Sequence, residues 1–208
     1  MKKITVYLVA LFTISLFQGN GQIIDNKIYV NPNIGTNTNK GTKENPLKSL
    51  SEAGKHVSAA EGEGSITVFL SAGVYGMSET ADFNAKNWKF SKTNRLTIRA
   101  EILPDDTNWS PAEMPIMIST MPFSVEKNDK GELTGGQNFG IMIQNSHATI
   151  QGLRILGEPV HENPSKGVLV RNYPIMWEGK DLEDFRVTQC LFLGNKYALP
   201  NHLGILAN

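Results

Sequence analysis

Charged residues gather in one short segment near residue 180. Asp181, Glu183 and Asp184 lie within four positions, and Arg171 and Arg186 flank them in the sequence. Two carboxylates at a fixed separation can serve as the acid and base of glycoside hydrolysis. A solvated, charge-balanced loop gives the same pattern, because charged side chains are mostly exposed. We therefore assign no catalytic residue, and predict that Arg171 and Arg186 contribute to substrate binding.

Aromatic residues in expected loops give a better indication of a carbohydrate ligand. Tyr173 and Trp177 follow a strand-like segment, and Trp109 lies in a polar stretch after residues 101–102. Sugar rings pack their C–H faces on aromatic rings, and Trp and Tyr add a polar group. Packing of the loop onto the protein body is the alternative. The sequence predicts Tyr173 and Trp177 as substrate-binding residues.

The other reactive side chains favour structural roles. The one cysteine, Cys190, falls at an inward position of an internal repeat, and a buried thiol behaves as a small hydrophobe. The histidines are His56, His147, His161 and His202, and no pair has the His-x-x-x-His spacing of a metal site. We predict no metal site from these residues.

An internal repeat predicts the elements that hold these residues. Residues 149–157 align with residues 186–194 at an offset of 37, which places Leu153 opposite Cys190. Residues 140–145 also resemble residues 167–172, at an offset of 27, and residues 204–208 resemble both. Repeats of 20 to 50 residues are typical of solenoids, in which each unit buries its apolar face against its neighbours.

Short strands and one helix account for the earlier half of the chain. Residues 27–30, 66–70, 96–99 and 115–119 read as strands, three of them with period-two alternation. Residues 49–60 predict an amphipathic helix, with Ser49 and Glu52 at capping-box spacing. We expect the polar stretch 31–42 to be an ordered loop, and residues 121–138 to be an exposed loop or hairpin.

The first 21 residues have the layout of a secretory signal peptide. Lys2 and Lys3 precede fourteen mostly apolar residues, 4–17, and a small, polar segment follows at 18–21. A bilayer span needs about 20 residues, so a cleaved signal is favoured over an uncleaved anchor. The sequence predicts an exported protein that is free of the membrane after cleavage. Its location would be secreted, periplasmic or cell-surface.

Composition excludes several classes of protein. The 208 residues carry 20 Lys and Arg against 20 Asp and Glu, so no basic excess favours nucleic-acid binding. Apolar residues form 40% of the chain, which argues against disorder. A single cysteine excludes an internal disulfide framework. Residues 22–208 are therefore expected to form one folded domain.

The entry segment resembles that of right-handed parallel β-helix proteins of the pectin-lyase-like superfamily. The similar features are residues 28–32 (Ile-Tyr-Val-Asn-Pro), Gly41-Thr42, Asn45-Pro46, Ser49-Leu50 and residues 71–75 (Ser-Ala-Gly-Val-Tyr). The resemblance implies an all-β, right-handed parallel β-helix with an N-terminal amphipathic α-helical cap. Because residues 204–208 fall in mid-strand by repeat alignment, we expect a truncated domain whose active residues lie beyond Asn208.

The resemblance also implies a function. Proteins of this superfamily bind polysaccharides along one sheet face and cleave them as lyases or glycoside hydrolases, in some cases with bound Ca²⁺. The expected function is therefore binding and cleavage of an extracellular polysaccharide, with Ca²⁺ a possibility only by resemblance. A non-enzymatic carbohydrate-binding, adhesion or structural module is the alternative, since one fold hosts many functions.

Overall fold

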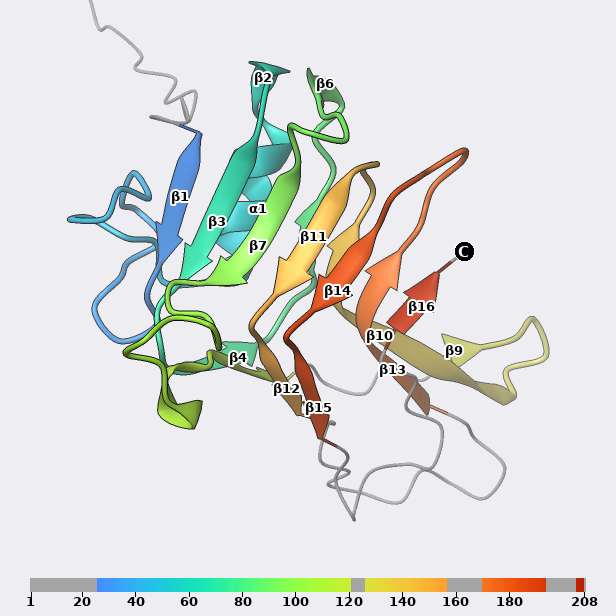
Figure 1. Cartoon of the computed structure of the whole chain (residues 1–208). Helices are drawn as coiled ribbons and strands as arrows, with labels where there is room; N and C mark the ends of the chain where they lie inside the picture. The colour runs from blue at the N-terminus through green and yellow to red at the C-terminus, as the bar shows by residue number, and fades with distance from the viewer. Residues whose placement is uncertain (1–25, 121–125, 157–169, 194–204, 208) are drawn as a thin grey trace, which may run out of the picture.

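The computed structural model describes residues 26–120, 126–156, 170–193 and 205–207. These residues are mostly β, and their strands form four all-parallel sheets stacked as in a solenoid (Figure 1). The predicted repeat architecture is confirmed at this level. The predicted signal peptide lies outside the described residues. No helix within the described ranges is long and apolar enough to cross a membrane.

Three main sheets run along the solenoid, and each is named here by its first strand. The β1 sheet contains β1 (Lys27–Val30), β3 (Ile66–Leu70), β7 (Leu96–Ala100), β11 (Ala148–Gln151) and β14 (Arg186–Thr188). The β4 sheet contains β4 (Val74–Met77), β8 (Ile116–Ser119), β12 (Arg154–Leu156) and β15 (Leu191–Leu193). The β5 sheet contains β5 (Ala81–Phe83), β10 (Leu133–Ile143), β13 (Val170–Trp177) and β16 (Ile205–Ala207).

A small sheet, a 3₁₀ turn and a hairpin lie outside the three main sheets. The fourth sheet pairs β2 (Glu61–Glu63) with β6 (Asn87–Lys89), and a 3₁₀ turn, η1 (Pro111–Glu113), follows β7. β9 (Glu126–Lys127) pairs antiparallel with the start of β10, and this hairpin projects from the body (Figure 1). In its described part, the segment 121–138 is therefore a hairpin, which is one of the two alternatives that the sequence predicted.

The core lies between the three main sheets and is built from alternate residues of each strand. In the β1 sheet, the inward residues in register are Ile28, Val68, Ile98, Ile150 and Val187. The first four of them are buried, and Val187 packs partly buried against them. Because a buried aliphatic side chain contributes about 1.5–3 kcal/mol, such columns are the main source of stability in this fold.

The repeat offset of 37 is confirmed by the register of two sheets. Ile150 pairs with Val187, and Ile155 pairs with Phe192. Cys190 packs against the buried core as predicted, and its burial raises the pKa of its thiol. This thiol is therefore a poor nucleophile, in agreement with its structural assignment.

The predicted offset of 27 is wrong. Ile141 pairs with Ile175, which shifts the match of residues 140–145 from 167–172 to 174–179. Ile175 pairs in turn with Ile205, so the predicted equivalence of residues 140 and 204 holds. The error arises because period-two apolar patterns look alike at several registers. At the observed register the two backbones approach closely, because a Cβ on Gly140 would lie 2.6 Å from the Pro174 carbonyl oxygen.

The predicted helix is α1 (Leu50–Ser58), and its cap differs from the capping box in one respect. The Ser49 hydroxyl accepts the Glu52 amide at 3.3 Å, as predicted. The Ser49 amide instead donates to the Asn37 side-chain oxygen at 3.0 Å, while Glu52 pairs with Lys55 at 3.1 Å. The stretch 31–42 is thus an ordered loop whose Asn37 helps to start the helix.

Helix α1 covers the outer edge of β5, the edge that does not pair with β10. This is the capping role that the sequence predicted. The Ser58 hydroxyl donates to the Asp82 carbonyl at 3.3 Å and accepts the Asn84 amide at 2.9 Å. Gly54 faces the same strand, and a Cβ there would lie 2.5 Å from the Asp82 carbonyl oxygen. Contact this close requires glycine at position 54.

Replacing Gly54 with alanine is therefore expected to lower the free energy of unfolding by about 2 kcal/mol, the typical cost of overpacking. On a free helix surface the same change stabilises by about 1 kcal/mol, so the sign of the effect tests the contact. Urea unfolding followed by circular dichroism measures it. The exposed Lys55→Ala variant is the control, and stabilisation by Gly54→Ala would contradict the capping contact.

Candidate functional site

The outer face of the β1 sheet presents two straight rows of side chains. Row one contains Lys27, Thr67, Thr97, Thr149 and Arg186, and row two contains Tyr29, Phe69, Arg99, Gln151 and Thr188. Parallel pairing holds neighbouring strands about 4.8 Å apart, so each row repeats at that spacing along the solenoid. No helix in the described part of the chain covers this face (Figure 1), and none of the ten residues is buried.

Row two begins with a stacked column. The Tyr29 and Phe69 rings lie 5.0 Å apart at 16°, and the Arg99 guanidinium lies 5.7 Å from the Phe69 centroid. Because the rings stack on one another, their edges rather than their faces point outward. The column fixes the register of three strands and places the Arg99 cation on the open face.

The Arg99 guanidinium keeps donors for a ligand. Its Nε donates to the Ala100 carbonyl at 3.0 Å, and its Nη2 lies 3.5 Å from the Glu101 carbonyl. Arginine carries five N–H donors in a planar fork, so the Nη1 pair stays available. Lys27 adds an exposed ammonium at the start of row one and makes no ion pair with the described residues.

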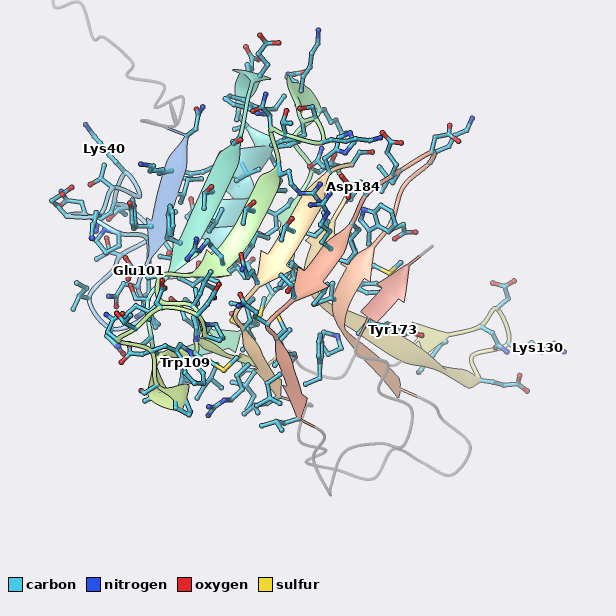
Figure 2. All side chains as sticks on the ribbon, viewed as in Figure 1. Lys40, Glu101, Trp109, Lys130, Tyr173 and Asp184 are labelled. Atoms are coloured by element: carbon cyan, nitrogen blue, oxygen red, sulfur yellow. The ribbon has the colours of Figure 1, made fainter. Side chains whose placement is uncertain are left out.

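Polar side chains close the carboxyl end of this face. The Gln189 amide donates to Asp105 at 2.6 Å and accepts from Gln151 at 2.6 Å. The Gln189 hydrogen bond lowers the pKa of Asp105 below its usual value. Glu101, labelled in Figure 2 at this end, accepts a hydrogen bond from Ser71 at 2.8 Å.

Three ionisable residues form a ladder at the opposite end of the sheet. Arg95 and His147 directly precede β7 and β11, and Asp184 lies two residues before β14, so the three occupy equivalent positions on successive coils. We call them the charged ladder. Arg95 forms an ion pair with the Asp184 carboxylate and donates to the Ala148 and Asp184 carbonyls at 2.7 and 2.8 Å. Nδ1 of His147 lies 3.2 Å from Asp184 Oδ2.

The ionisable groups of the ladder are paired with one another and with neighbouring residues. Arg186 also donates to Asp184, at 2.9 Å, and Nε2 of His147 lies 3.3 Å from Glu183. The Arg95 hydrogen bond, helped by those of His147 and Arg186, lowers the pKa of Asp184 to about 2 against the opposing effect of desolvation. A carboxylate held this firmly ionised is unsuited to act as a general acid. We interpret the ladder as a clamp between coils.

The predicted binding aromatics lie in a strand rather than in a loop. Tyr173 and Trp177 are both part of β13, so the loop assignment is wrong. Tyr173 is 6% exposed and stacks on Phe139, and Trp177 stacks on Phe185 and donates to the Asn145 carbonyl at 3.2 Å. The period-two alternation of β13 continues through Pro174. Because proline is rare within strands, this strand was not predicted from the sequence.

The two arginines predicted to bind substrate lie in different sheets. Arg186 lies in row one and pairs with Asp184, whereas Arg171 belongs to the β5 sheet, where its backbone pairs with Gln137. The predicted acidic cluster also divides, because Asp184 joins the charged ladder while Asp181 remains in an exposed turn. Trp109 lies in the loop before η1, as predicted, and is partly exposed.

The histidines differ in surroundings. His56 is on α1, 3.8 Å from Glu52, and its side chain is only 18% exposed rather than free in solvent. His147 lies directly before β11. His161 and His202 lie outside the described residues.

Sequence reasoning missed four residues of this face and of the charged ladder: Arg95, Arg99, Tyr29 and Phe69. The last three occupy outward positions in alternating strands, so the alternation carried the signal for row two. Arg95 carried no comparable signal, because long insertions separate it from its partners.

The described residues contain no group of three His, Cys, Asp or Glu side chains able to hold a metal ion, so the Ca²⁺ that the resemblance implies stays a prediction. We derive no step through this ion. Comparisons of the chain with protein-family models, with curated proteins and with solved structures find no significant match.

Proposed function

We propose that the chain is an exported β-helix protein of the pectin-lyase-like type that binds an acidic polysaccharide along the outer face of the β1 sheet. The observation that carries the proposal is the charge of rows one and two. Their ten side chains include no carboxylate and three cations, Lys27, Arg99 and Arg186, of which Arg186 also pairs with Asp184 beside the face. The remainder are hydroxyl, amide and aromatic groups.

The regular spacing of the rows suits a repeating polymer. A polysaccharide lying along the solenoid axis meets an equivalent position every strand, so weak contacts add along its length. Guanidinium groups bind carboxylates and sulfates through paired hydrogen bonds, whereas threonine and glutamine suit sugar hydroxyls.

Cleavage of the polysaccharide, as a lyase or glycoside hydrolase, stays a prediction. Among the described residues, Asp184 beside this face is fully paired, which favours binding over catalysis. The non-enzymatic carbohydrate-binding or adhesion module is therefore the form of the proposal that the geometry supports best. Release of unsaturated or reducing sugar ends from uronate-rich glycans by the purified chain would show that it is also an enzyme.

Replacing Arg99 with alanine is expected to weaken binding of a polyuronate roughly tenfold, because a charge-assisted hydrogen bond contributes about 1.5–3 kcal/mol. Affinity electrophoresis in polyuronate gels, repeated at two salt concentrations, measures the change. Lys130→Ala is the matched control, because it removes a cation from the tip of the β9–β10 hairpin, far from this face (Figure 2). Equal retardation in neutral and acidic glycans, or equal losses for the two variants, would overturn the proposal.

A further inference from the structure

The cations on the outer face of the β1 sheet lie on every second strand. Lys27 is on β1, Arg99 on β7 and Arg186 on β14, which are the first, third and fifth strands in the order of the sheet (Figure 1). The strands between them, β3 and β11, present only uncharged side chains to this face, namely Thr67, Phe69, Thr149 and Gln151. Positive charge therefore recurs about every 10 Å along the solenoid, which is twice the separation of parallel strands.

Stacking holds Arg99 at the level of its own strand. The Tyr29 and Phe69 rings lie 5.0 Å apart, and the Arg99 guanidinium carbon lies 5.7 Å from the Phe69 centroid. Both distances are close to the separation of neighbouring strands, about 4.8 Å. The three groups therefore follow one another strand by strand, and the Arg99 charge stays level with β7.

Arg186 is also held in place and keeps free donors. Its Nε and Nη2 atoms donate to Asp184 at 2.9 and 3.3 Å, which leaves the two N–H groups of Nη1 without a partner among the described residues. Asp184 also forms an ion pair with Arg95, so two guanidinium groups share one carboxylate. Because the Arg186 side chain is 56% exposed, its free donors are accessible to a ligand.

Carboxylates border the two rows at both ends of the strands. Glu101 and Asp105 lie at the carboxyl end of the face, and Glu183 and Asp184 lie at the amino end. A polymer with a carboxylate on every sugar would place some of its charges opposite β3 and β11, where this face has no cation. These charges would meet only the repulsion of the bordering carboxylates.

The length of a sugar residue connects this pattern to a polymer. A sugar in an extended polysaccharide advances the chain by about the separation of two parallel strands, so a polymer along the solenoid axis presents roughly one sugar to each strand. Cations on alternate strands then match anionic groups on alternate sugars. The threonine, glutamine and aromatic groups between them match uncharged sugars, through hydrogen bonds to hydroxyls and contacts with C–H groups.

We propose that the polysaccharide bound by this face carries one carboxylate or sulfate per disaccharide, so that acidic sugars alternate with uncharged ones. This inference rests on the proposed function and names the substrate class of the same face. Guanidinium groups form paired hydrogen bonds with carboxylates and with sulfates, so the face selects the spacing of the anions. A homopolymer of uronic acid, which carries a charge on every sugar, is then the poorer ligand.

The test compares hexasaccharides of different charge spacing on the full chain. The three cations span about 19 Å, so a hexasaccharide is long enough to reach all of them. Hyaluronan carries a carboxylate on every second sugar, κ-carrageenan carries a sulfate on every second sugar, and polyglucuronate carries a carboxylate on each sugar. Affinities are measured by NMR titration at one salt concentration.

At least one of the two alternating hexasaccharides is expected to bind about tenfold more tightly than polyglucuronate, although each carries half its charge. The tighter of the two identifies the anion as carboxylate or sulfate. Binding of polyglucuronate that equals or exceeds that of both alternating polymers would overturn the proposal, because total charge would then decide the affinity.

Two variants with the same added charge test the spacing within one polymer. Thr67→Lys places a cation on β3, between the strands of Lys27 and Arg99, whereas Thr97→Lys adds one to β7, which already carries Arg99. Both threonines lie in row one and are partly exposed, so the two variants are matched in row and in net charge. Thermal unfolding checks that both variants keep the fold.

Thr67→Lys is expected to strengthen polyglucuronate binding about tenfold, because a charge-assisted contact is added opposite an unmatched carboxylate. Thr97→Lys should strengthen the same binding far less. Equal gains for the two folded variants would show that the position of the charge is irrelevant, and the proposed spacing would be wrong.

The inference and the proposed function fail in different ways. If Arg99→Ala weakens polyuronate retention while polyglucuronate binds as tightly as the alternating polymers, the charge spacing alone is wrong. If Arg99→Ala leaves the retention of every acidic polymer unchanged, the binding face itself is wrong, and the spacing fails with it.

Discussion

Arg95→Ala is expected to lower the free energy of unfolding clearly, because Arg95 is mostly shielded from solvent and its loss leaves the Asp184 carboxylate without its main partner. The Arg95 side chain is 11% exposed. It bonds to Thr149 at 2.8 Å as well as to the Ala148 carbonyl and to Asp184, so it joins three successive coils. Urea unfolding at neutral pH measures the loss.

Arg186→Ala is the matched control. Both arginines bond to the Asp184 carboxylate, but the Arg186 side chain is 56% exposed. Exposed ion pairs contribute about 0–1 kcal/mol, so this variant should lose far less stability than Arg95→Ala. Similar losses for the two variants would show that the charged ladder does not clamp the coils.

The pH dependence of stability provides a second measurement of the same clamp. The pKa of Asp184 falls from a usual value near 3.8 to about 2 in the folded chain, chiefly through the Arg95 hydrogen bond. The unfolded chain therefore binds the proton first as the pH falls. The contribution of Asp184 is complete above about pH 4 and is lost as the pH falls toward 2. Arg95→Ala should flatten the stability profile in this window.

The repeat was predictable where two apolar motifs share one offset. Ile150 with Val187 and Ile155 with Phe192 both align at an offset of 37. The register of β10 on β13 was not predictable from alternation, since the correct match, Ile141 with Ile175, competes with a similar apolar segment seven residues earlier. Period-two alternation by itself leaves several registers open.

The site was less predictable than the fold for a physical reason. Arg95 and Asp184 are 89 positions apart, and only the stacking of coils brings them together. Local clustering pointed instead to residues 181–186, of which the ladder uses Asp184.

Ile98→Ala is expected to lower the free energy of unfolding by about 4 kcal/mol, the largest effect among these variants. Ile98 is fully buried and packs in register between Val68 and Ile150, so truncation leaves a cavity that neither neighbouring coil can fill without moving. Isoleucine-to-alanine changes in such sites cost about 2–5 kcal/mol. In a solenoid each coil is held only by its neighbours, so a cavity in a middle coil weakens both interfaces.

Thr97→Ala tests whether this effect comes from the core rather than from the strand. Thr97 is adjacent in β7 but lies in row one on the outer face, where strand preference alone changes stability by about 1 kcal/mol or less. Chemical denaturation of both variants under identical conditions gives the comparison. A loss for Thr97→Ala equal to that for Ile98→Ala would mean that the two faces of β7 are not divided into core and solvent, and the inward column would have to be reassigned.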